Sequence, residues 1–295
     1  MLSKELIAKL RHLEINTKKL VSDMLGGQYL SVFKGSGMAF SEVRPYQPGD
    51  EIRLIDWNVT ARMNEAFVKI FSEERELTVF ILVDLSSSLQ FGSFLQSKAE
   101  VCAEVTAQIA FSAITNGDRV GALLFTDRIE KLLVPKRGRK HVMRLIADLM
   151  SYVPTGTQTN LSLALTALSH AISRRSVVFI VSDFLDQGFE DKLKVASKKH
   201  DLIPVVIEDS FERAFPSVGL VSFEDSETGE RMLIDTSSPA VREQFRLQRE
   251  QFFHARDQLF KRLNMDGVLL SPGEANGMAL QQFFRARARR LRKTA

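Results

Sequence analysis

Five oxygen-bearing side chains fall in three short segments that are widely separated along the chain. They are Asp84, Ser86 and Ser88 in the first segment, Thr157 in the second and Asp183 in the third. Carboxylates and hydroxyls with so few formal charges form an all-oxygen set that suits Mg²⁺, with Mn²⁺ and Ca²⁺ as alternatives. These groups do not fill the shell of six oxygens that Mg²⁺ requires, so an open coordination position is expected.

Apolar runs immediately precede both carboxylates. Residues 79–83 lead to Asp84, and residues 177–181 lead to Asp183. Short runs rich in Val, Ile and Phe that alternate with helical patterns are typical of buried parallel strands. Because ligands bind at the carboxyl ends of the strands in an open α/β sheet, we expect both carboxylates at one edge of a sheet.

The pattern over residues 76–295 predicts an α/β domain with a doubly wound, mainly parallel sheet. A hairpin insertion is expected near 219–236, with its turn at Thr228-Gly229. Besides the two strands named above, strands are expected at 120–125, 202–207 and 267–270, and an antiparallel one at 129–134. Helices are expected at 97–115, 140–150, 161–173, 193–199 and 240–263, followed by a basic helix at the C-terminal end of the sequence.

Residues 1–75 are predicted to form a small N-terminal α+β module. Apolar residues at helical spacing over 6–24 predict a helix, and Gly26-Gly27 is a signal for its end. Strand and turn signals follow, including an apolar run at 66–71.

The three oxygen-bearing segments, in this order, resemble the metal-ion-dependent adhesion site (MIDAS) of von Willebrand factor A domains. The matching motifs are D-x-S-x-S at 84–88, T-x-T at 157–159 and an aspartate after a later strand. The resemblance implies that Ser86, Ser88 and Thr157 are hydroxyl ligands. It also implies that Asp84 and Asp183 act directly or through water, and that the open position binds a carboxylate of a partner protein.

A segment ahead of the site resembles the signature of a bacterial family called domain of unknown function 58. It reads RPYQPGDEIRLIDW at 44–57 and is followed by Arg62. This second resemblance implies a partner, a MoxR-type AAA+ ATPase, for which the chain would act as an adaptor or co-chaperone in assembling or activating a client protein.

The signature places mixed charges around the single tryptophan. We expect Arg53, Asp56, Trp57 and Arg62 to form a structural brace, in which a buried ion pair accompanies an arginine stacked on the ring. A surface that docks a partner is the alternative.

Composition limits the class of protein. The 295 residues are 44% hydrophobic and 26% charged, as in an ordinary globular protein. No apolar run approaches the roughly 18 residues of a membrane helix, and the N-terminus has no apolar signal core, so a cytoplasmic protein is expected. The single cysteine, Cys102, excludes an internal disulfide and is interpreted as a small core residue.

The positive charge is concentrated near the C-terminal end. The net charge is +4, whereas residues 285–293 contain six basic side chains. Such a helix could contact nucleic acid or an acidic protein, but a solvated terminal helix is the simpler interpretation, and nucleic acid is not expected as a partner. The basic run at 136–140 is likewise interpreted as a solvated loop.

The sequence lacks the common catalytic motifs, and one enzymatic alternative is left. The sequence contains no phosphate-binding G-x-x-x-x-G-K-[ST] loop, no G-x-S-x-G elbow and no zinc spacing among its five histidines. A metal-dependent phosphatase or hydrolase using Asp84 stays open, because haloacid-dehalogenase-like phosphatases also begin with a strand that ends in Asp. Their second carboxylate, two residues on, is replaced here by Ser86, so we expect a non-enzymatic interaction module.

Overall fold

The computed structural model describes residues 39–294 except 64, 73–76, 93–95 and 225–229. The chain divides into two compact units, of which the smaller is Phe33–Leu77 and the larger contains Thr78–Ala295. The helix predicted over 6–24 lies outside the described residues. None of the described helices combines the length and the apolar composition that crossing a bilayer requires.

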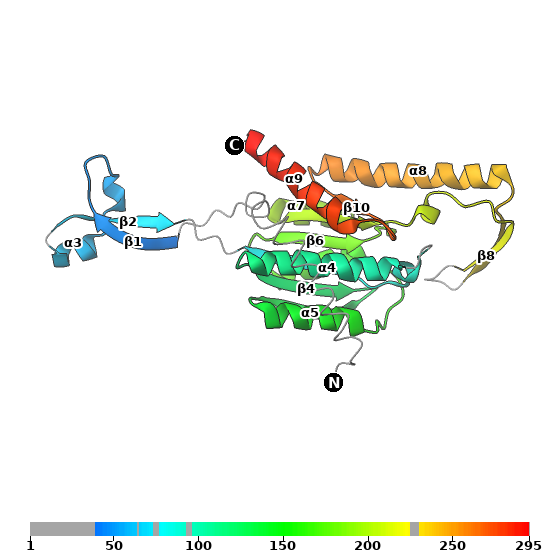
Figure 1. Ribbon diagram of the computed structural model, residues 1–295, viewed down its shortest axis with the longest axis horizontal. Coiled ribbons are helices and arrows are strands. Elements are labelled where there is room, and N and C mark those ends of the chain that lie inside the picture. Colours follow the sequence, from blue (N-terminus) through cyan, green and yellow to red (C-terminus); the bar gives the residue numbers. More distant parts are fainter. Residues whose placement is uncertain (1–38, 64, 73–76, 93–95, 225–229, 295) are drawn as a thin grey trace. The chain divides into compact units, whose positions relative to one another are not determined.

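A six-stranded sheet forms the centre of the larger unit (Figure 1). Its strand order is β10-β7-β6-β3-β4-β5, and every neighbouring pair is parallel except β4 and β5. The predicted α/β class with a mainly parallel sheet is therefore confirmed. The strands are β3 (Thr78–Asp84), β4 (Arg119–Phe125), β5 (Ile129–Lys136), β6 (Val177–Ser182), β7 (Asp201–Ile207) and β10 (Val268–Leu270).

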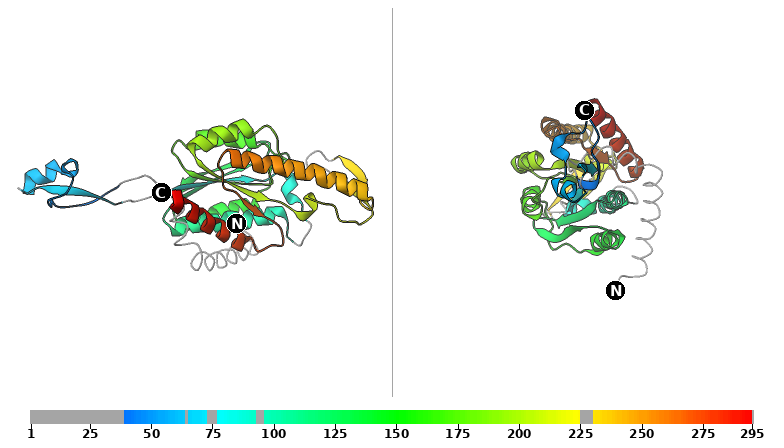
Figure 2. Two further views of the ribbon diagram at one scale, coloured as in Figure 1. Left: turned by 90° about the horizontal axis from the view of Figure 1, so that it is seen from above. Right: turned by 90° about the vertical axis from the view of Figure 1, so that its left-hand side faces the viewer.

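Helices cover both faces of this sheet (Figure 2). They are α4 (Lys98–Thr115), α5 (Arg139–Ser151), α6 (Leu161–Ala171), α7 (Glu190–Lys199), α8 (Pro239–Arg262) and α9 (Asn276–Thr294). Because both faces are covered, the central strands have no side that needs polar residues, which is why they appear in the sequence as continuous apolar runs.

Strand β3 shows how the core fixes the site. Its alternate residues Phe80 and Leu82 are fully buried in a cluster with side chains of α6, α7 and α8, among them Leu165, Leu193 and Phe260. The register pairs Val83 with Val181 of β6 on one side of β3. A shift of one residue would exchange the two faces of the strand, so burial on both sides holds the strand ends in place.

The predicted hairpin is present as β8 (Leu220–Glu224) paired antiparallel with β9 (Arg231–Asp235), and the turn predicted between them lies outside the described residues. Beside it, the ring of Phe215 stacks on Phe245 of α8, with centroids 3.7 Å apart. The aromatic contact attaches the start of α8 to the segment that leads into the hairpin.

The smaller unit contains β1 (Ala39–Pro45) paired antiparallel with β2 (Phe67–Ser72). Between these strands lie a single 3₁₀ turn, η2 (Ile52–Leu54), and the short helix α3 (Trp57–Met63). Strand β2 corresponds to the apolar run expected at 66–71, whereas α3 was not among the expected elements.

Two basic side chains of the C-terminal helix α9 form ion pairs within the protein. Arg287 is buried, and its guanidinium donates to both carboxylate oxygens of Asp201 at 2.5 Å. Arg290 pairs with Asp266, also at 2.5 Å. The helix is therefore attached to the edge of the sheet by specific ion pairs, and only part of its charge is solvated as expected.

We predict that Arg287→Ala destabilises the protein by about 1–3 kcal/mol, because it removes charge-assisted hydrogen bonds from a buried group. The matched control is Arg289→Ala, which truncates an exposed arginine of the same helix and should change stability by less than about 0.5 kcal/mol. Urea unfolding of both variants measures the difference. Equal losses in the two variants would contradict the structural role given to Arg287.

Candidate functional site

The carboxyl ends of β3 and β6 bring the two predicted carboxylates to one edge of the sheet. Asp84 and Asp183 are both buried there. Asp84 accepts two hydrogen bonds, one on each oxygen. The Ser182 hydroxyl donates to Oδ2 at 2.6 Å, and the backbone N–H of Ser86 donates to Oδ1 at 2.9 Å. The aspartate is thereby fixed by its own loop and by the neighbouring strand.

The two hydroxyls of the D-x-S-x-S loop face the second carboxylate. Ser88 Oγ donates to Asp183 Oδ2 at 2.8 Å, and Ser86 Oγ lies 3.1 Å from Ser88 Oγ. The other oxygen of Asp183 accepts the N–H of Leu185 at 3.1 Å. The structure therefore places Asp84, Ser86, Ser88 and Asp183, four of the five predicted ligands, in one cluster.

Thr157 reaches the same loop through its backbone instead of its hydroxyl. Its carbonyl oxygen accepts the N–H of Ser87 at 2.8 Å, whereas the residue itself is exposed. The T-x-T segment therefore lies against the D-x-S-x-S loop, while the side chain of Thr157 is not among the four clustered groups.

Glu130 of β5 holds the chain that leads into Thr157. Its carboxylate accepts the backbone N–H groups of Thr155 and Gly156, at 2.9 and 2.8 Å, and the Tyr152 hydroxyl at 3.1 Å. Gly156 is required here, because a Cβ at this position would overlap the side chains of Thr126 and Asp127. Burial acts to raise the pKa of Glu130, but the hydrogen bonds from Gly156, Thr126 and Thr155 outweigh it, so the pKa is lowered.

Two charged residues that the sequence analysis did not propose complete the cluster. Lys98, at the first turn of α4, is fully buried, and its Nζ lies 2.8 Å from Asp183 Oδ2. The same ammonium lies 2.5 Å from Glu212 Oε1. Burial opposes the charge on Lys98, but the adjacent Asp183 and Glu212 outweigh it and raise its pKa. A charged ammonium therefore sits between two carboxylates.

Burial dominates the electrostatics of Asp84. Desolvation, and after it the charge of Asp183, raises the pKa of Asp84 to about 7, although hydrogen bonds from Ser182 and Ser86 act in the opposite direction. Two carboxylates side by side in a buried place are costly when both are ionised. A divalent cation between them would relieve this cost.

The donor set fits a small divalent cation. Adjacent oxygens around an octahedral ion at 2.0–2.1 Å are about 3 Å apart, close to the separation of the Ser86 and Ser88 hydroxyl oxygens, 3.1 Å. Within the described part of the chain, no group of three or more His, Cys, Asp or Glu side chains is arranged for a metal. The cluster at this edge differs from such a group, because two of its four candidate ligand residues are serines.

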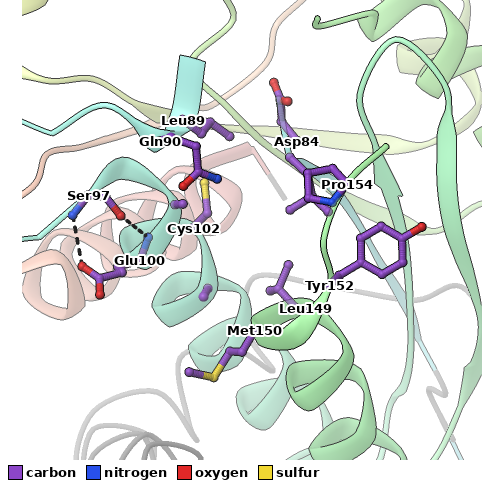
Figure 3. Close-up of a pocket in the computed structure, with 13 residues that line it drawn as sticks. Asp84, Leu89, Gln90, Ser97, Glu100, Cys102, Leu149, Met150, Tyr152 and Pro154 are labelled. Atoms are coloured by element: carbon purple, nitrogen blue, oxygen red, sulfur yellow. Dashed lines mark hydrogen bonds between the residues drawn. The ribbon is translucent and has the colours of Figure 1, made fainter. Parts of the chain in front are cut away.

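A cavity of about 400 Å³ borders the site, between the loop after β3, helix α4 and the segment after α5 (Figure 3). Asp84 stands at its edge with its carboxylate directed away from Leu149 and Met150. Cys102 also lines the cavity, and burial, followed by the nearby carboxylates, raises its pKa well above the ordinary value. The interpretation of Cys102 as a small core residue is confirmed by its 2% exposure.

The signature residues near Trp57 are arranged differently from the expected buried brace. Trp57 is 65% exposed, and no arginine within the described residues stacks on its ring. Asp56 caps α3 by accepting the N–H groups of Asn58 and Val59, at 2.9 and 3.2 Å. Arg53 and Arg62 are exposed. The expected ion pair with an arginine stacked on the ring is therefore wrong, because Asp56 is engaged by the helix terminus and by a lysine of β2.

Asp56 instead pairs with Lys69, whose Nζ lies 3.6 Å from Asp56 Oδ2, and a further ion pair of this segment involves Arg44. Arg44 donates from both terminal nitrogens to Asp50, each at 2.7 Å, and Asp50 also accepts the N–H of Gln47 at 2.8 Å. The positive φ of Gly49, 109°, allows the tight turn between Gln47 and Asp50. The P-G-D part of the signature therefore forms a tight turn that hydrogen bonds to the Asp50 carboxylate stabilise.

Three residues of the cluster were not predicted, and the sequence signals for them differ in strength. Glu212 lies in the D-S-F-E segment at 209–212, just after β7, so its place at the same sheet edge could have been inferred. Ser182 directly precedes Asp183 and could have been proposed with it. Lys98 gave no such signal, because a lysine in the first turn of a helix is usually exposed.

Comparisons with known proteins agree with the signature. Residues 42–252 match the family described as "Protein of unknown function DUF58". The uncharacterized protein Rv1480 of Mycobacterium tuberculosis is 33% identical over 247 residues, which cover 82% of this chain and 77% of that protein.

Two solved structures are similar at lower levels. BatB from Bacteroides thetaiotaomicron has a TM-score of 0.49 at 14% identity and covers 72% of this chain and 99% of its own. The VWA domain of SpRpn10 has a TM-score of 0.40 at 13% identity and covers 70% of this chain and 95% of its own. At these values neither likeness bears on the function of this chain.

The raised pKa of Asp84 predicts a pH dependence of the metal-free protein. Because the folded pKa of about 7 exceeds the ordinary 3.8, the protonated form is favoured on folding; this contribution to stability is fully present below pH 3.8, falls as the pH rises through about 7 and levels off above it. Metal affinity should rise over the same range, since the ligand is the ionised carboxylate. Thermal unfolding in EDTA from about pH 5.5 to about pH 8.5 measures the effect.

The control for this prediction is Asp84→Asn. An amide can keep both hydrogen bonds, because the Ser182 hydroxyl can also accept. The difference in melting temperature between wild type and Asp84→Asn should therefore change with pH in favour of the variant at high pH. A difference that stays constant across the range would show that Asp84 does not titrate there.

Proposed function

Because the chain belongs to the DUF58 family of proteins of unknown function, and because four of its predicted ligands cluster at one sheet edge, we propose that it is a metal-dependent protein–protein interaction module. The observation that carries the proposal is the contact chain Ser86–Ser88–Asp183, in which two hydroxyl oxygens and a buried carboxylate face one another. Hydroxyls are weak ligands alone, and their gathering beside two carboxylates is typical of a hard divalent cation.

Each residue has a specific task in this proposal. Ser86 and Ser88 offer hydroxyl oxygens to the metal, while Asp84 and Asp183 supply negative charge, directly or through water. Thr157 remains a proposed ligand that requires its exposed side chain to turn towards the cluster. The metal supplies a positive centre with a free position, and an Asp or Glu of another protein is the natural oxygen donor for it.

The proposed metal is Mg²⁺, with Mn²⁺ or Ca²⁺ as substitutes, and the proposed partner is a MoxR-type AAA+ ATPase or its client. The resemblance of the motifs supports this partner, and a cytoplasmic location accompanies it. Acting as an adaptor or co-chaperone requires only a switchable contact, which a metal site with an open position provides.

Phosphoryl transfer by Asp84 is less well supported. A nucleophilic carboxylate needs an accessible oxygen, whereas Asp84 is fully buried and both of its oxygens accept hydrogen bonds. Ser86 stands where the second carboxylate of such phosphatases would be. Turnover of a generic phosphoester that disappears in Asp84→Asn would favour the enzyme over the adaptor.

We predict that Mg²⁺ or Mn²⁺ raises the melting temperature of the wild-type chain and that Asp84→Asn abolishes the increase. A ligand that binds only the folded state at a concentration 100 times its Kd stabilises by about 2.7 kcal/mol. Asp186→Asn is a matched control, because Asp186 lies near the same edge but accepts the backbone N–H of Leu161. Calorimetry that gives equal metal binding in both variants would place the metal elsewhere.

We also predict that binding of the partner is sensitive to chelators. Without metal, a partner carboxylate would be desolvated and unpaired, so the complex should be lost in EDTA and weakened at least about tenfold by Ser88→Ala. Ser169→Ala, on α6 and exposed, is the control. Pull-downs with and without EDTA, read for a MoxR-type ATPase, measure this.

A complex that forms equally well in excess EDTA would move the interface away from Asp84. The exposed apolar side chains of the smaller unit, Ile52, Trp57 and Met63, would then be the first to truncate, followed by the basic run at 136–140.

A further inference from the structure

Lys98 occupies a fixed place beside the proposed metal site. The residue opens α4, whose N-terminus is held by reciprocal hydrogen bonds between Ser97 and Glu100. Its side chain is fully buried, so the ammonium cannot move into solvent without opening the structure. An uncompensated buried ammonium is costly, and Lys98 is accordingly paired with the two carboxylates of Asp183 and Glu212.

Glu212 is anchored independently of Lys98. Its Oε2 accepts the backbone N–H of Asp209 at 3.0 Å, and its backbone carbonyl accepts Arg249 Nε of α8 at 2.8 Å. Only Oε1 faces the ammonium. Glu212 is therefore a rigid group that holds Lys98 at the site.

The contact with Asp183 is of a different kind, because it uses an oxygen that the site also needs. Asp183 Oδ2 accepts both Lys98 Nζ and Ser88 Oγ, each at 2.8 Å. A cation bound by the Ser88 hydroxyl would thus lie next to the ammonium and would draw on the same carboxylate. Two positive charges beside the same carboxylate repel each other, and solvent screens this repulsion only weakly because the site is buried.

We propose that the Lys98 ammonium competes with the metal for the Asp183 carboxylate and so keeps the metal affinity of this site low. Glu212 opposes this competition, because its carboxylate attracts the ammonium away from Asp183. The inference rests on the proposed metal-binding function and deepens it. A site adjusted in this way holds its metal weakly until a partner carboxylate adds another ligand and further negative charge. The ammonium also compensates the buried carboxylates while no metal is bound.

The test uses the full chain, stripped of metal and titrated calorimetrically with Mn²⁺ alone. Lys98→Met, which keeps a linear side chain without the charge, should tighten Mn²⁺ binding about tenfold or more. Glu212→Gln should weaken it severalfold, because the ammonium then rests on Asp183 alone. Adding Lys98→Met to Glu212→Gln should restore the affinity to about the wild-type level or above, and this pair leaves no unpaired carboxylate at position 212 if Lys98→Met alone does not fold.

The opposite signs of the two single variants are the decisive feature. If Lys98 and Glu212 were only structural, both substitutions would weaken binding, and that result would overturn the proposal. Lys98→Met that fails to tighten binding in the Glu212→Gln background would overturn it as well. Absence of Mn²⁺ binding in the wild type and in all variants would instead reject the metal site itself, so the two failures can be distinguished.

Discussion

Two aspartates at the ends of adjacent parallel strands are buried side by side, and much of the surrounding structure compensates for this. Asp84 is held by Ser182 and its own loop, while Asp183 is held by Ser88, Leu185 and the Lys98 ammonium. An ionised carboxylate in such a place is stable only with partners that neutralise or hydrogen-bond it. The burial that makes these groups costly also makes them effective ligands, because solvent does not weaken their attraction for a cation.

The same constraint explains how distant parts of the chain take part in the site. The central strands cannot shift, since both of their faces are covered, so the positions of the carboxylates follow from the core. The T-x-T segment is fixed by other means, through the Glu130 carboxylate and the close approach at Gly156. Lys98 and Glu212 then connect the sheet edge to α4 and, through Arg249, to α8. Asp183 is therefore connected through these contacts to α4 and α8.

Much of this arrangement could be predicted from the sequence. Apolar runs that end in aspartate predicted the sheet and the meeting of Asp84 with Asp183, because parallel strands end at one edge whatever the details of packing. The environment of Trp57 and the direction of the Thr157 side chain could not be predicted in the same way, since they depend on which hydrogen-bond partners the local backbone offers. Lys98 was missed because its burial arises only when two carboxylates from other elements converge on it.

The central claim is that a divalent metal lies between the D-x-S-x-S loop and Asp183. Anomalous diffraction from crystals soaked in Mn²⁺ tests it most directly, because the signal locates the ion without reference to activity or to a partner. The account predicts one strong peak within coordination distance, about 2.0–2.3 Å, of the Ser86 and Ser88 hydroxyl oxygens. A peak elsewhere on the surface, or none at this edge when the same crystals hold Mn²⁺ at other positions, would contradict it.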